Sequence, residues 1–182
     1  MQEVQTVHFS RIDSPVGPLL LAATDDGLRY LMFDRGTQPR PRPDEVWIES
    51  SAALRVYEEQ LGAYFRGELR AFTCKLDLKG TFFQKKCWSA LQQIPYGTTC
   101  SYRELAKQVG SPRAFRAVGQ ANHNNPVAII VPCHRVIGAN GSLTGYGGGM
   151  EVKEKLLRME GAALQGALAF SANTETKANA KP

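Results

Sequence analysis

The sequence lacks several features that would each point to a particular class of protein. Its four cysteines, Cys74, Cys87, Cys100 and Cys133, form no Cys-x-x-Cys pair, which disfavours a zinc site of the usual spacing, so neither a metal nor another cofactor is expected. No apolar run approaches the roughly 18 residues of a membrane span, and no association with a membrane is expected. The first residues show no basic start followed by an apolar stretch, which predicts that no signal peptide is present and that the protein is cytoplasmic.

The composition that remains is that of an ordinary globular protein with an uneven distribution of charge. The chain has 182 residues, of which 43% are hydrophobic and 21% charged, enough for one domain or two small ones. Residues 1–78 hold 9 Lys/Arg against 12 Asp/Glu, whereas residues 79–160 hold 11 Lys/Arg against 4 Asp/Glu. A basic second half suits a phosphate backbone, although a solvated basic face would have the same composition.

The first part of the chain predicts a small sheet followed by a helix. Hydrophobic alternation and the turn Asp25-Asp26-Gly27 predict a hairpin, and apolar residues at helical spacing predict a helix over 50–66. The full set of expected elements is strands near 7–12, 19–23, 28–33 and 72–78, a loop over 35–45, and that helix. Residues 1–78 are therefore predicted to form an N-terminal α/β domain.

The second part predicts a mainly helical domain over residues 79–161. Thr81 is a suitable N-cap for a first helix, and Ser101 with Glu104 matches a capping box for a second. A tight turn at 110–112 leads to a helix over 113–121, so that the two short helices form a helix-turn-helix pattern. A short buried strand is expected over 127–131, a glycine-rich loop over 138–149, a final helix over 151–159 and a flexible tail over 162–182. The predicted fold class is α/β (α+β).

Cys133 stands out because of its neighbours. It follows a short apolar run and precedes His134, Arg135 and the glycine-rich loop, a position from which a side chain can be presented into a pocket. A thiol needs a base or a positive neighbour to become a nucleophile at neutral pH. The dipeptide alone is equally compatible with a buried cysteine beside an unrelated histidine.

The wider run of residues resolves this ambiguity. Residues 125–138, with the core Pro132-Cys133-His134-Arg135, closely resemble the active-site segment of the O6-alkylguanine-DNA alkyltransferase family. The match covers residues 81–161, and residues 1–78 are similar to the family's more variable N-terminal domain. Further stretches agree in order and spacing: Ile94-Pro95-Tyr96-Gly97, Ser101-Tyr102-Arg103-Glu104, Arg116-Ala117-Val118-Gly119, Gly145-Tyr146-Gly147-Gly148-Gly149 and residues 153–161.

The resemblance implies a direct and irreversible repair reaction in a single turnover. Cys133 would attack the alkyl carbon on guanine O6, and activity on O4 of thymine is left open. His134 would act as a base through a water molecule, and Glu160 would orient His134. Tyr102 would hydrogen-bond the base and help to protonate the departing guanine. Asn125 would tie the turn before the active-site segment to the pocket.

The resemblance also implies a binding mode for double-stranded DNA containing O6-alkylguanine. The second helix would enter the minor groove, the damaged nucleotide would rotate out of the stack, and Arg116 would fill the space that it leaves. A monomer is expected, and cooperative binding along DNA is left open. The remaining assignments are DNA contacts at Ala114, Phe115, Ala117, Gly119, Arg135 and Tyr102, and base-pocket walls at Val136, Tyr146, Gly147 and Gly148.

One position departs from the family pattern, and two other functions compete with repair. Phe115 stands where family members commonly have a small residue beside the arginine, so that it would either wedge into the groove or pack inward. A lesion sensor without catalysis, as in relatives that replace the acceptor cysteine, is disfavoured by Cys133 itself. A Cys-His hydrolase is disfavoured because no hydrolase motif accompanies the pair and because the second half is basic.

Overall fold

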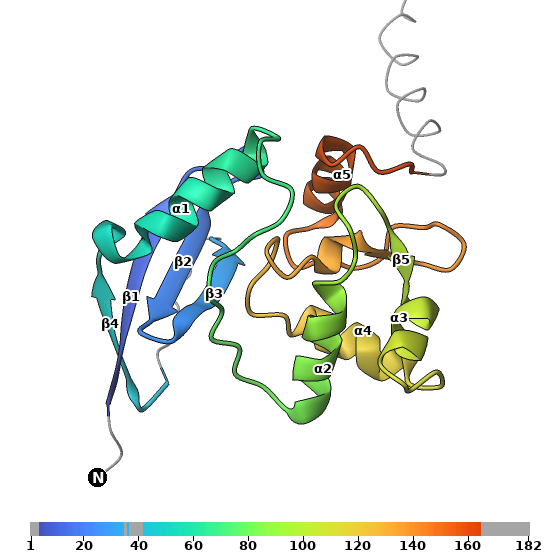
Figure 1. Cartoon of the computed structure of the whole chain (residues 1–182), viewed down its shortest axis with the longest axis horizontal. Helices are drawn as coiled ribbons and strands as arrows, with labels where there is room; N and C mark the ends of the chain where they lie inside the picture. Colours follow the sequence, from blue (N-terminus) through green and yellow to red (C-terminus); the bar gives the residue numbers. More distant parts are fainter. Residues whose placement is uncertain (1–3, 35, 37–41, 165–182) are drawn as a thin grey trace, which may run out of the picture.

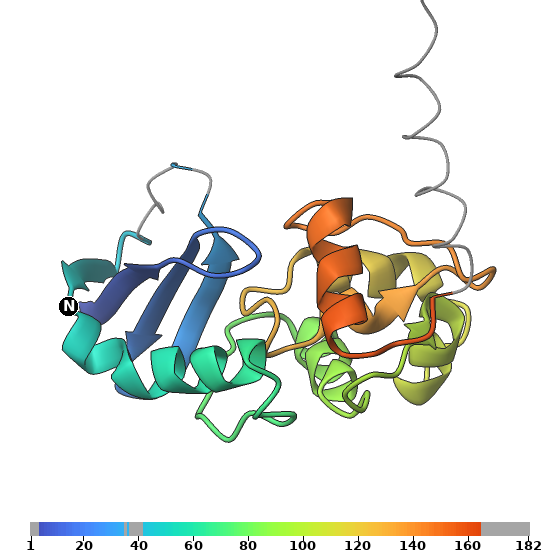
Figure 2. The same cartoon turned by 90° about the horizontal axis from the view of Figure 1, so that it is seen from above.

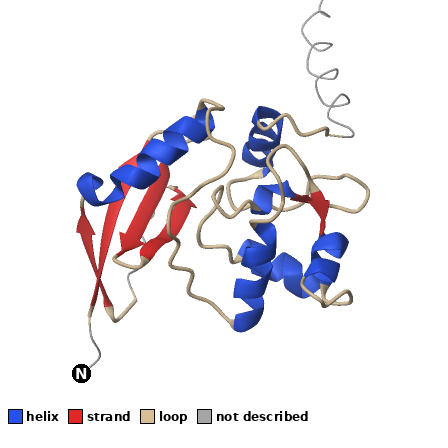
Figure 3. Ribbon diagram, in the orientation of Figure 1, coloured by secondary structure: helices blue, strands red, loops and turns tan. Residues whose placement is uncertain are grey.

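The N-terminal lobe is built on a four-stranded sheet in the order β3-β2-β1-β4 (Figures 1 and 3). The computed structural model describes residues 4–34, 36 and 42–164, and part of the expected 35–45 loop and most of the expected tail lie outside them. Antiparallel pairing joins β1 to β2 and β2 to β3, and β1 runs parallel to β4. The strands are β1 (Gln5–Ile12), β2 (Leu19–Thr24), β3 (Gly27–Phe33) and β4 (Glu45–Glu49).

One face of this sheet is covered by α1 (Ser51–Phe65), as Figure 2 shows. The side chain of Ser50 caps the helix by accepting a hydrogen bond from the backbone of Ala53. Every residue of β2 is buried, and on the face away from α1 the side chains of Leu20 and Ala22 are covered by neighbouring side chains of the same sheet. The buried stripe of α1 follows the helical period that the sequence predicted, and it consists of Leu54, Tyr57, Leu61 and Tyr64. The first three expected strands and this helix are confirmed.

Two predictions about this lobe are wrong. The strand β4 was not expected from the sequence. Its apolar residues Val46 and Ile48 are 49% and 46% exposed, whereas Glu45 points inward and pairs with buried Arg29 at 2.7 Å. The pattern of hydrophobic residues is therefore inverted in this strand. Residues 72–78, in contrast, form no strand and make only an isolated bridge between Leu76 and Leu28.

The C-terminal lobe is mainly helical, as expected. Capping boxes begin α2 (Phe82–Leu91) at Thr81 and α3 (Tyr102–Gln108) at Ser101. The predicted second helix of the helix-turn-helix is α4 (Phe115–His123), which begins two residues later than predicted and has no side-chain cap. The remaining elements are the short parallel pair β5 (Cys100–Ser101) and β6 (Val136–Ile137), the 3-10 turn η1 (Cys133–Arg135), and α5 (Met150–Met159).

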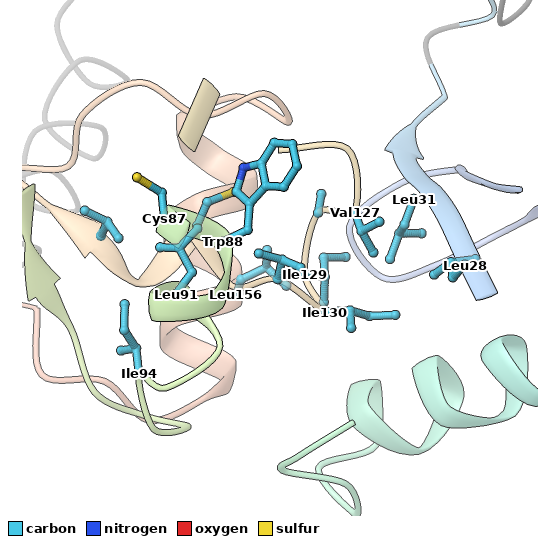
Figure 4. Close-up of a cluster of buried hydrophobic side chains, with 14 of the residues drawn as sticks. Leu28, Leu31, Cys87, Trp88, Leu91, Ile94, Val127, Ile129, Ile130 and Leu156 are labelled. Carbon is cyan, nitrogen blue, oxygen red and sulfur yellow. The ribbon is translucent and has the colours of Figure 1, made fainter. Parts of the chain in front are cut away.

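The buried segment 127–131 packs between the two lobes and leads the chain to Cys133. Figure 4 shows Val127 beside Leu31 of β3, and Ile129 and Ile130 between the sheet and α2. The segment was predicted to be a strand, but it makes one bridge, from Val127 to Leu31, and then turns, with Ile129 at a φ of +70°. The turn brings Cys133 to the C-terminal lobe while its apolar side chains stay in the core. None of the helices in the described ranges combines the length and the apolar character that a membrane crossing needs.

Candidate active site

Cys133 lies at the wall of a cavity of about 690 Å³ between α4 and the glycine-rich loop. It is the first residue of η1 and is exposed by only 9%, so its sulfur faces the cavity rather than the open surface. Other lining residues come from α3, α4 and the loop, and they include Tyr102, Phe115, Gly119, Asn122, Thr144, Tyr146 and Gly147. The enclosure can hold a small planar molecule against the thiol.

Asn125 holds Cys133 in place through its side-chain amide. Its Nδ2 donates to Cys133 Sγ at 3.1 Å and to the carbonyl of Val131 at 2.8 Å, while its Oδ1 accepts from the backbone of Val127 at 3.0 Å. Burial raises the pKa of the Cys133 thiol, and the hydrogen bond from Asn125 and the charge of Lys153 act in the opposite direction. The thiol therefore needs a base to become a thiolate at neutral pH.

His134 can supply that base. Its Nε2 lies 2.8 Å from Glu160 Oε1, and both side chains are fully buried. Burial lowers the pKa of His134, and the attraction of Glu160 offsets this only in part, so the ring is neutral near pH 7. Since Nε2 faces the carboxylate, Nδ1 is the nitrogen available to accept a proton, and it has no hydrogen-bond partner within the described residues.

Glu160 receives five hydrogen bonds from two lobes. Besides His134, it accepts from Arg135 Nε at 2.9 Å and Nη2 at 3.0 Å, from the Tyr64 hydroxyl at 2.6 Å and from the Gly97 amide at 3.3 Å. Burial alone would raise the pKa of this carboxyl, but the hydrogen bonds from His134 and Arg135 outweigh burial and lower it to about 2. Glu160 is therefore a permanent anion that fixes the ring of His134.

Arg135 belongs to this internal network, and its prediction as a DNA contact is wrong. The residue is only 6% exposed, and its guanidinium binds Glu160 and the carbonyl of Ile94, the latter at 2.6 Å. The guanidinium is therefore held inside the protein, where the negative charge of Glu160 compensates its positive charge.

Tyr64 and Lys153 were missed by sequence reasoning. Tyr64 comes from α1 in the other lobe. A tyrosine on the buried face of a helix needs a hydrogen-bond partner for its hydroxyl, and this was the one sequence signal that could have pointed to its bond with Glu160. Lys153 of α5 is fully buried and donates to the carbonyls of Val136 at 2.6 Å and Thr144 at 2.8 Å, which ties the glycine-rich loop to the segment after Cys133. Burial lowers the pKa of Lys153 to about 8.

Two of the four predicted pocket walls line the cavity, and two lie behind it. Tyr146 and Gly147 are lining residues, and the Tyr146 ring packs edge-on against His134 with centroids 6.4 Å apart. Val136 is fully buried, and Gly148 packs so closely on Phe33 that an added Cβ would lie 2.8 Å from the ring. These two positions support the wall from outside the cavity.

The outer face of α4 carries the predicted DNA contacts. Arg116 and Ala117 are exposed, and Phe115 is 40% exposed at the rim of the cavity with the Arg116 guanidinium 5.9 Å from its ring centroid. Phe115 therefore does not pack inward. Ala114 and Gly119 are partly exposed, and Tyr102 accepts a hydrogen bond from the Thr144 hydroxyl at 3.3 Å within the cavity wall.

Buried polar atoms without partners gather around Cys133. Within the part of the chain that the structure describes, five such side-chain atoms occur, and four of them belong to Asn122, His134 and Tyr146. The fifth is on His8, in the N-terminal sheet. Unmet polar groups in a cavity are typical of a site that completes its hydrogen bonds with a bound molecule. In the described ranges, no three His, Cys, Asp or Glu side chains gather so that they could hold a metal ion.

Comparisons with known proteins agree on one family. Residues 82–162 match the model of the 6-O-methylguanine DNA methyltransferase DNA-binding domain, and residues 7–78 match that of the 6-O-methylguanine DNA methyltransferase ribonuclease-like domain. The methylated-DNA–protein-cysteine methyltransferase of Methanosarcina acetivorans is 52% identical over 155 residues, covering 85% of this chain and 99% of the relative. The protein of the same name from Mycobacterium tuberculosis is 52% identical over 154 residues, covering 85% and 92%. A crystal structure of Mycobacterium tuberculosis OGT in complex with DNA is similar with a TM-score of 0.78 at 51% identity, over 85% of this chain and 92% of that one.

Proposed function

Because the chain belongs to the 6-O-methylguanine DNA methyltransferase family, we propose that it repairs DNA by transferring an alkyl group from O6 of guanine to Cys133. The observation that carries this proposal is the thiol of Cys133 at a cavity wall, next in sequence to a neutral His134 that a buried carboxylate orients. This arrangement supplies a nucleophile, a base and a group that fixes the base.

The transfer is an in-line displacement at the alkyl carbon. His134 Nδ1 takes the proton of the thiol, directly or across one water molecule, and the positive ring that forms is stabilised by Glu160. The bond from sulfur to carbon forms as the bond from carbon to O6 breaks, and the Tyr102 hydroxyl donates toward the departing guanine. The thioether that results is stable, so each molecule of protein reacts once.

The partner in this proposal is duplex DNA that contains O6-alkylguanine. A stacked base cannot reach Cys133 in its cavity, so the nucleotide has to rotate out of the helix. The exposed residues Arg116 and Ala117 of α4 would enter the minor groove, and Arg116 would fill the space that the nucleotide leaves. The similar OGT of Mycobacterium tuberculosis forms a crystallised complex with DNA, which supports DNA as the partner of this chain.

The organisation of the chain is part of the proposal. Residues 1–78 would form the N-terminal domain, residues 79–161 the domain that binds DNA and accepts the alkyl group, and the protein would act as a cytoplasmic monomer. The hydrogen bond from Tyr64 to Glu160 implies that the N-terminal domain contributes directly to the catalytic network.

Intact-mass spectrometry after mixing the protein with duplex DNA containing one O6-methylguanine tests the proposal. We expect the mass to rise by that of one methylene group, and peptide mapping to place the gain on Cys133. Cys133→Ala should abolish the gain and retain measurable DNA binding, whereas Cys100→Ala, which removes another buried thiol, should leave the gain intact. No mass gain with lesion-selective binding would favour a sensor, and no gain without binding would refute the proposal.

A further inference from the structure

The side chain of Asn122 is buried in the wall of the active-site cavity without a hydrogen-bond partner. It belongs to α4, is only 7% exposed, and lines the same cavity as Cys133. Neither its Nδ2 nor its Oδ1 meets a donor or acceptor among the residues that the structure describes. Two unmet polar atoms on one buried side chain are rare in folded proteins.

The fold itself does not use this amide. A buried amide that lacks partners makes the protein less stable than an apolar side chain of similar size would. The other buried residues of α4, Val118 and Ala121, are apolar, so the interior side of the helix accepts apolar side chains. Asn125, in contrast, uses both ends of its amide to hold the backbone and Cys133.

Within the described part of α4, Asn122 is the only residue that contributes a buried polar side chain to the cavity lining. The other lining residues of α4 are Phe115, Gly119, Gln120 and His123, which are exposed or, in the case of Gly119, carry no side chain. Asn122 is therefore more buried than the other side chains that α4 contributes to the cavity lining.

We propose that Asn122 is a substrate-contacting residue that hydrogen-bonds the nucleobase held in the cavity and helps to select which base reacts. The inference rests on the proposed function. A primary amide offers a donor and an acceptor, the combination with which asparagine pairs with base edges. A base that leaves the duplex loses its pairing partners, so groups in the cavity have to replace them. A site built to hydrogen-bond its substrate rejects molecules that leave its buried polar groups unpaired.

Asn122→Leu separates this role from a structural one, because the two roles predict opposite effects on stability. Leucine has a similar size and no polar group, so the thermal midpoint of the free protein should stay equal or rise. The second-order rate of alkyl transfer should fall about tenfold or more, both for duplex O6-methylguanine and for free O6-benzylguanine. Asn122→Ala provides a smaller side chain in case leucine does not fit.

Asn124→Leu is the matched control, because Asn124 lies two residues further on and is exposed. This variant should react with free O6-benzylguanine at the wild-type rate. A fall in the thermal midpoint of both Asn122 variants with an unchanged rate on the free base would overturn the proposal and make the residue structural. A loss of rate on duplex DNA alone would also overturn it, since the contact would then be to the sugar–phosphate backbone.

The mass assay keeps this inference distinct from the proposed function. If the wild-type protein gains no alkyl group, the function itself has failed. If the wild-type protein reacts and Asn122→Leu reacts equally fast on both substrates, the function stands and only the role of Asn122 is refuted.

Discussion

Replacing Glu160 by glutamine changes one oxygen to nitrogen in the carboxylate that binds both His134 and Arg135. The carboxylate accepts hydrogen bonds at both oxygens, from His134, Arg135, Tyr64 and Gly97. An amide can accept at only one of its ends, so its NH₂ group has to face at least one of these donors. Arg135 also loses the buried charge that compensates its own.

Two independent estimates give the size of the effect at pH 7. Removing one partner of a buried ion pair costs about 3–5 kcal/mol. The lowering of the pKa of Glu160 from 4.5 to about 2 corresponds to about 3 kcal/mol, since one unit is worth about 1.4 kcal/mol. Both values are a large fraction of the roughly 5–15 kcal/mol that keeps a typical domain folded.

The sign of the pH dependence follows from the direction of this shift. A carboxyl whose folded-state pKa is lowered stabilises the protein above its ordinary pKa, and that contribution is lost as the pH falls toward the folded-state value. The free energy of unfolding of the wild-type protein should therefore approach that of Glu160→Gln between about pH 5 and pH 2.

Urea denaturation of both proteins at pH 7 and pH 3 measures this difference. Glu154→Gln is the control on the same helix, because Glu154 forms an exposed pair with Arg158 that is worth at most about 1 kcal/mol. A loss at pH 7 no larger than that of the control, or a loss that is the same at both pH values, would refute the reasoning. The transfer rate of Glu160→Gln should also fall, because the ring of His134 is then less firmly oriented.

Three further predictions test other parts of the site. Gly97→Ala should lower the thermal midpoint more than Gly67→Ala does. Both glycines have a φ of +75°, but only at Gly97 would an added Cβ lie 2.7 Å from the Glu160 carbonyl oxygen. Equal losses of stability in the two variants would contradict this contact. Between pH 8 and about 10.5, urea titrations should show the wild-type protein becoming more stable relative to Lys153→Met. The lowered pKa of Lys153 lets the folded state release a proton that the unfolded state keeps. A difference in the free energy of unfolding that does not change with pH would exclude a lowered pKa for Lys153. Arg116→Ala should slow the repair of duplex DNA more than the reaction with free O6-benzylguanine in single-turnover assays, and equal slowing would exclude a role in flipping.

Local sequence signals predicted those features that a few neighbouring residues decide. The caps at Thr81 and Ser101, the hairpin around Gly27 and the buried stripe of α1 each depend on side chains within one or two turns of each other. The run around Cys133 likewise predicted a nucleophile with an adjacent base, and comparison with known relatives confirmed the family to which this run pointed. These signals survive folding because the residues that carry them are already neighbours in the chain.

Tertiary structure alone decided which groups meet across long separations. Tyr64 and Glu160 are 96 positions apart, and no pattern near either residue indicates the bond between them. Arg135 is the last residue of the motif core, and its side chain turns inward because the residue that follows α5, Glu160, supplies a carboxylate to it. The same holds for β4, whose inward glutamate is stabilised by Arg29 from another strand, and for the unmet amide of Asn122. A charged or polar group is buried where the folded chain supplies a partner for it or where a bound molecule can supply one. The periodicity of the sequence carries no information about such distant partners or about bound molecules.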